Sequence, residues 1–93
     1  MNLYKLSQTV NNDYDTYDSC VVVAKTEQDA KLMHPADGSI FPAGRWSNSG
    51  LIPYYRTHVF YFDWALPENV NVTLIGTTNS TEAEVIIASF NAG

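Results

Sequence analysis

The chain has 93 residues, a formal net charge of −5 and one cysteine. A chain of this length predicts one domain, residues 1-93, that buries only about two-thirds of its extended surface, so self-association would supplement a modest core. Nucleic-acid-binding modules gather Lys and Arg on one face, and five such residues against ten Asp and Glu argue against that class.

The N-terminal part of the chain predicts two strands joined by a polar loop. Residues 2–9 form the first, whose imperfect alternation suits an edge or a half-covered position. Asn-Asn-Asp at 11–13 favours a turn. Ser19–Lys25 contains an unbroken apolar run rich in β-branched residues, which is typical of a central strand buried on both faces. We therefore expect an antiparallel hairpin whose loop places the aromatic and acidic residues of 14–18 at a sheet end.

A short helix is predicted after the second strand. Thr26 is a suitable N-cap, with an acidic residue three positions on in a weak form of the capping box. The helix should stop at His34, because Pro35 disfavours the α conformation in the residue before it. Ala30, Met33 and His34 would share one face of this helix.

Residues 35–55 are the least regular part of the chain and hold three of its four prolines. A loop this long in a small domain is usually functional or partly disordered, and its aromatic content favours order. An aromatic strand is expected over 58–64, followed by strands over 70–75 and 85–90. The expected fold class is α+β, a mostly antiparallel sheet of about four to five strands with one short helix packed on a face.

Enzyme signatures are not recognised in the sequence. The aspartates near residue 15 lack the spacing of a calcium loop, and His34 and His58 lack that of a zinc site. No glycine-rich phosphate loop or nucleophile motif is recognised. We therefore expect no catalytic residue, no metal and no cofactor. His34 is expected to pack or to form a hydrogen bond rather than to act as a catalyst.

The single cysteine and the apolar pattern indicate a reducing cytoplasm. Cys20 lies inside the expected central strand, where it should behave as a small hydrophobic residue rather than a nucleophile. One cysteine allows no disulfide within the chain. A leader peptide and a run of about 20 apolar residues are both missing, so no membrane partner is expected.

A binding pocket is better supported by the sequence than an active site. Purine rings stack on aromatic faces, and phosphates bind arginine forks and backbone amides. Both ingredients occur in Arg45 and Trp46 and again in 54–56, which ends in Arg56. The alternative is that these aromatics cover the core while the arginines pair with surface carboxylates. Asn91 follows an expected strand directly, so its amide is a candidate for reading a base or ribose edge.

Four motifs resemble a group of small bacteriophage proteins. They are Tyr-Asp-x-Tyr-Asp-Ser at 14–19, His-Pro at 34–35, Val-x-Val-x-x-Ile-Gly at 70–76 and Ala-Ser-Phe-Asn-Ala-Gly at 88–93. Together they span nearly the whole chain. The group is similar to the phage anti-Thoeris proteins, which sequester cyclic ADP-ribose signals.

The resemblance implies a counter-defence protein of the host cytoplasm. It would bind a cyclic ADP-ribose isomer or cyclic oligonucleotide without cleaving it, as a homo-oligomer and without a nucleic-acid polymer as partner. Phe90 and Asn91 match a pattern associated with nucleotide contact. The expected ligand-binding residues are Tyr17, Arg45, Trp46, Arg56, Phe90 and Asn91. The alternatives are an anti-CRISPR or similar inhibitor that masks a host protein, and an enzyme that cleaves the signal.

Overall fold

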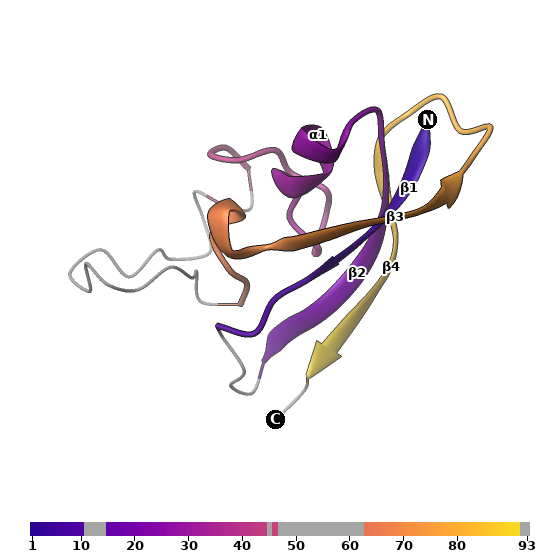
Figure 1. The fold of residues 1–93 in the computed structure, drawn as a ribbon. Helices are drawn as coiled ribbons and strands as arrows, with labels where there is room; N and C mark the ends of the chain where they lie inside the picture. Colours follow the sequence, from indigo (N-terminus) through magenta and orange to yellow (C-terminus); the bar gives the residue numbers. More distant parts are fainter. Residues whose placement is uncertain (11–14, 45, 47–62, 92–93) are drawn as a thin grey trace.

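The computed structural model describes residues 1–10, 15–44, 46 and 63–91 (Figure 1). Their main feature is an antiparallel sheet of four strands in the order β3-β1-β2-β4. The strands are β1 (Asn2–Ser7), β2 (Thr16–Ala24), β3 (Asn71–Thr77) and β4 (Glu84–Asn91). A short helix, α1 (Glu27–Lys31), and a 3-10 turn, η1 (Pro67–Asn69), complete the elements. This mostly antiparallel sheet with one short helix is the arrangement that the sequence predicted.

The expected fifth strand, over 58–64, falls mostly outside the described residues. Its last two positions, Asp63 and Trp64, form a bend rather than a strand. Both side chains are buried, Trp64 completely. These last two residues of the alternating aromatic pattern therefore fill the core from a loop rather than from a strand.

The hairpin of β1 and β2 forms as predicted, with antiparallel pairing from Asn2 opposite Ala24 to Ser7 opposite Ser19. β1 does not lie at an edge, because its other side pairs with β3. The half-covered interpretation holds instead, since Leu6 is buried while Lys5 is exposed. The pattern is irregular at Leu3, where the pairing of β1 with β3 shifts register between Leu3 and Tyr4.

β2 begins at Thr16, earlier than Ser19, because the polar residues before the apolar run also join the sheet. Thr16 pairs with Asn91 and Tyr17 with Phe90. A register shift between Tyr17 and Ser19 marks a bulge at Asp18. Bulges bend a strand and redirect its side chains, and they are common near functional sites.

Helix α1 starts as predicted but ends earlier, at Lys31 rather than His34. Thr26 is the N-cap, and its side chain accepts a hydrogen bond from the Asp29 N–H over 3.1 Å. After the helix the chain folds back on itself, because Met33 forms an antiparallel bridge with Ile40. This bridge between residues seven positions apart takes the place of the expected last helical turn.

The core lies on one side of the sheet, which we call the covered face. Helix α1 contacts β1, β2 and β3 there, and Figure 1 shows α1 and the segment that follows it on the same side. Side chains alternate along a strand, so Cys20, Val22 and Ala24 of β2 lie on this face, whereas the buried Val23 between them points to the other. The core includes Tyr4, Leu6, Cys20, Val22, Ala30, Met33, Trp46 and Trp64.

Candidate functional site

A chain of aromatic contacts runs from the end of β4 into the core. The ring centroids of Phe90 and Tyr17 lie 4.8 Å apart, those of Tyr17 and His34 6.1 Å, and those of His34 and Trp46 5.1 Å. A fourth contact joins Trp46 to Phe41 at 5.3 Å. All four are edge-to-face, which the charge distribution of aromatic rings favours. Phe90 is 47% exposed and Trp46 is fully buried, so the chain has one end at the surface.

The surface end is formed by Tyr17, Phe90 and Asn91, which come from the adjacent strands β2 and β4. Asn91 is held by its backbone, because its carbonyl oxygen accepts a hydrogen bond from the Asp15 N–H. Asp15 adopts a left-handed φ of 61°, which aspartate tolerates better than most residues. The structure therefore brings together three of the six residues that the sequence singled out.

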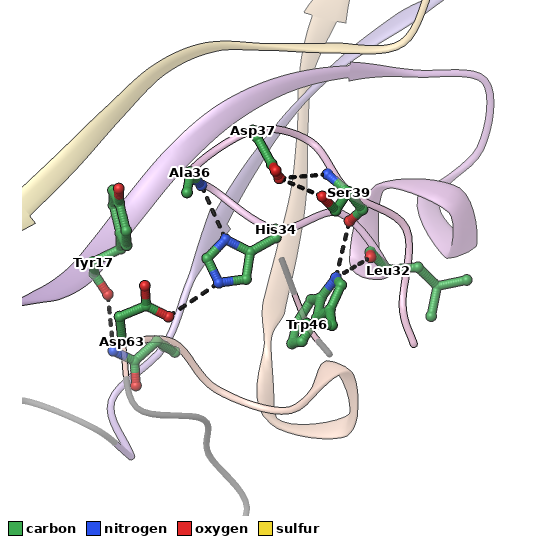
Figure 2. A network of polar contacts seen from close by, with 9 residues as sticks. Tyr17, Leu32, His34, Ala36, Asp37, Ser39, Trp46 and Asp63 are labelled. Atoms are coloured by element: carbon green, nitrogen blue, oxygen red, sulfur yellow. Dashed lines mark hydrogen bonds and ion pairs between the residues drawn. The ribbon is translucent and has the colours of Figure 1, made fainter. Parts of the chain in front are cut away.

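A buried polar pair lies below Tyr17 (Figure 2). The Nε2 atom of His34 lies 3.0 Å from Oδ1 of Asp63, and Nδ1 accepts a hydrogen bond from the Ala36 N–H over 3.0 Å. Because Nδ1 is an acceptor, Nε2 carries the ring proton and donates a hydrogen bond to the carboxylate. Both ring nitrogens are thus occupied by the protein. The arrangement suits a structural histidine and agrees with the expectation that His34 forms hydrogen bonds.

No sequence pattern predicted this pair. His34 and Asp63 are 29 positions apart, and Asp63 belongs to no recognisable motif. The backbone adds a further link, because the Tyr17 N–H donates to the Asp63 carbonyl over 2.9 Å. Asp63 therefore ties its loop both to β2 and to the residues after α1.

Trp46 lies in the core rather than at the surface end. Its indole N–H points at two carbonyl oxygens, that of Leu32 at 3.0 Å and that of Ser39 at 2.9 Å (Figure 2). Asp37 orders this turn, since its carboxylate accepts from the Ser39 N–H. In this position Trp46 covers the core, which is the alternative that the sequence left open for the aromatics of its segment.

The two arginines expected to contact a ligand, Arg45 and Arg56, lie outside the described residues, as do Tyr54 and Tyr55. The structure therefore leaves their role a prediction. The positive charge that a phosphate would require is not part of the surface end as described, which holds two aromatic rings and one amide.

Cys20 is buried, with 3% of its surface exposed, as expected for a small hydrophobic residue. Desolvation raises the pKa of its thiol from 9.0 to about 12. Thiolate is the nucleophilic form of cysteine, so burial keeps Cys20 in its unreactive state at neutral pH.

Other site types receive no support from the described part of the chain. Those residues contain no group of three or more His, Cys, Asp or Glu side chains placed to hold a metal ion. None of their helices is long and apolar enough to span a membrane. Comparison of the chain with protein-family models, curated proteins and solved structures finds no match.

Proposed function

We propose that this protein binds a cyclic nucleotide-type immune signal and withholds it from the host effector without cleaving it. In this proposal it acts as a phage counter-defence protein in the host cytoplasm. The observation that carries the proposal is the half-exposed ring of Phe90, supported by Tyr17 and followed by Asn91 at the end of β4. A ring platform beside an amide is the combination that nucleobase recognition uses.

The packing of Phe90 favours binding because it orders the ring in advance. Phe90 contacts Tyr17, and Tyr17 contacts the fully buried His34. A side chain that is already fixed loses less conformational entropy when a ligand stacks on it. Asn91 is the last residue of β4, so the strand fixes the backbone from which its side-chain amide extends. Arg45 and Arg56 would supply the charge for phosphate in this proposal.

The motifs of the resemblance give a second line of support. Residues 16–19 of the first motif form the start of β2, residues 88–91 of the last motif form the end of β4, and the two segments pair directly. Two motifs far apart in the sequence thus form one patch. This juxtaposition is what a shared binding role would require.

Binding without cleavage is favoured by the state of His34, the only histidine among the described residues. A general base must have a ring nitrogen within reach of the substrate. Nδ1 of His34 accepts from Ala36 and Nε2 donates to Asp63, and both side chains of the pair are buried. In this arrangement His34 has no free nitrogen to offer.

The alternative, an inhibitor that masks a host defence protein, is supported by a different observation. Large apolar side chains are exposed on the two edge strands, namely Leu74 and Ile75 on β3 and Ile86 and Ile87 on β4. Large apolar side chains left exposed on sheet edges often mark protein interfaces. They also support a homo-oligomer, which we propose as well and which light scattering at micromolar concentration tests.

One experiment separates these functions. The protein is purified from cells with an active signal-producing defence, denatured by heat, and the released small molecules are identified by mass spectrometry. A protein that only binds the signal releases it intact, and an enzyme releases its product. A protein inhibitor releases neither but co-purifies with a host protein. Release of product, or of no nucleotide from a protein that retains a host partner, would overturn the proposal.

A further inference from the structure

A row of small polar side chains crosses the sheet on the far face, which is the one opposite the covered face. Ser7 pairs with Asn71 on β3 and with Ser19 on β2, and Ser19 pairs with Ser89 on β4. Directly opposed residues of neighbouring strands point to the same side of a sheet. All four strands therefore contribute one hydrogen-bonding side chain to a single row.

The next row on this face adds one cation and an apolar surface. Lys5 pairs with Val21, and Val21 pairs with Ile87. A shallow hollow of about 360 Å³ lies where the two rows meet, lined by Lys5, Val21, Ile87, Ser19 and Ser89. Its lining is therefore polar at one side and apolar at the other.

The donors of this hollow are available to a ligand. Within the described part of the chain, Lys5 has no ion-pair partner, and the hydroxyls of Ser19 and Ser89 have no hydrogen-bond partner. Among the residues that the structure describes, Lys5 is also the only charged one that lines the hollow. On a chain of net charge −5, a lone exposed ammonium beside two hydroxyls is complementary to a small anion.

We propose that this hollow binds a small organic phosphate. The Lys5 ammonium and the hydroxyls of Ser19 and Ser89 hold the phosphate, while its organic part covers Val21 and Ile87. Val21 is half-buried and Ile87 is 66% exposed, so the apolar part of such a ligand removes a real apolar surface from water. The site is separate from Phe90 and Tyr17 and does not rest on the proposed function.

The test is an NMR titration of the full chain with phenyl phosphate. Inorganic phosphate and phenol are titrated separately, so that the anionic and apolar halves of the probe are resolved. We expect phenyl phosphate to shift the amide resonances of Lys5, Ser19 and Ser89 saturably, and each half alone to bind more weakly. Lys5→Gln should weaken phenyl phosphate about tenfold or more, because it removes a charged hydrogen bond.

Lys25→Gln is the matched control, because it removes the same charge from an exposed position at the end of β2 and should leave the titration unchanged. Equal weakening by the two substitutions would show that only the net charge matters and would overturn the proposal. Shifts confined to the amides of Tyr17 and Phe90 would overturn it as well. So would an oligomer whose far-face amide resonances do not shift when phenyl phosphate is added. None of these outcomes bears on the release of an immune signal.

Discussion

The imidazole of His34 and the carboxylate of Asp63 meet in the core, with 3.0 Å between Nε2 and Oδ1 and no water-accessible surface on the histidine. This pair joins the segment after α1 to the loop before η1, and the Asp63 carbonyl extends the link to β2. Breaking a buried pair costs more than its net stabilising energy, because the remaining partner is left without a hydrogen bond.

We therefore expect Asp63→Ala to lower the free energy of unfolding by about 2–4 kcal/mol, because it leaves the His34 Nε2–H unpaired in the core. Asp63→Asn keeps an oxygen that can accept this proton, so its loss should be clearly smaller. Urea denaturation of both variants measures the difference. Equal losses would contradict the assignment of Nε2 as the donor.

The two buried tryptophans form a matched pair for a second prediction. The Trp46 indole N–H donates to two carbonyl oxygens, whereas that of Trp64 has no hydrogen-bond partner in the described structure. Trp→Phe at either position removes similar volume from a fully buried site. Trp46→Phe should therefore cost about 1 kcal/mol more stability than Trp64→Phe, the net value of a typical hydrogen bond.

Thermal or urea unfolding of the two tryptophan variants tests this difference. The carbonyl of Leu32 also accepts from the Phe41 N–H, and that of Ser39 from the His34 N–H. Because neither carbonyl loses its last partner in Trp46→Phe, the extra loss of stability should stay small. If Trp64→Phe proves as costly as Trp46→Phe, the Trp64 indole has a partner in solution.

The buried thiol of Cys20 should make the folded protein less stable at high pH. The pKa of its thiol is about 12 in the folded chain against 9.0 for an unperturbed cysteine, so above about pH 9 the unfolded chain releases a proton that the folded chain retains. Stability is thus complete below pH 9.0 and falls with rising pH, by up to about 1.4 kcal/mol for each unit towards pH 12.

Cys20→Ala is the control for this slope, because other groups also titrate in alkaline solution. Between about pH 9 and 11, the unfolding free energy of the wild type should fall relative to that of the variant as the pH rises. A constant difference would show that the thiol is solvated. Rapid alkylation of the native protein by iodoacetamide at neutral pH would contradict its burial directly.

Local patterns in the sequence predicted the parts of the fold that local physics determines. Alternation located the strand that became β3, a further strand was expected where β4 lies, and the apolar run located the centre of β2. Thr26 was identified as a cap from its side chain and its acidic neighbours alone. Cys20 was placed in the core because it lies inside the strand that its apolar run predicted to be central.

What the sequence missed depends on pairing between distant residues. The end of α1 is set by the bridge of Met33 with Ile40, and the start of β2 by its pairing with the end of β4. The partner of His34 is Asp63, which no spacing rule connects to it. Of the candidate site, the sequence predicted Tyr17, Phe90 and Asn91 individually, but not that the first two share a ring contact.

The exposed ring of Phe90 leads to the final prediction. Removing an aromatic platform typically weakens base stacking by about 1–3 kcal/mol. Phe90→Ala should therefore weaken the binding of the signal by this amount, with little loss of thermal stability because the ring is 47% exposed. Asn91→Ala should cost less, since it removes a neutral contact, and Arg56→Ala roughly 1.5–3 kcal/mol, the range for a charged hydrogen bond.

Calorimetric titration with cyclic ADP-ribose isomers and with cyclic di- and trinucleotides measures these changes. Ile86→Ala is the matched control, because Ile86 is 52% exposed on the same strand and carries no aromatic ring. The two truncations should differ in their effect on binding, since both remove apolar surface and only Phe90→Ala removes the aromatic platform. A ligand that binds wild type, Phe90→Ala and Ile86→Ala equally does not stack on Phe90, and the surface end of the aromatic chain is then not its site.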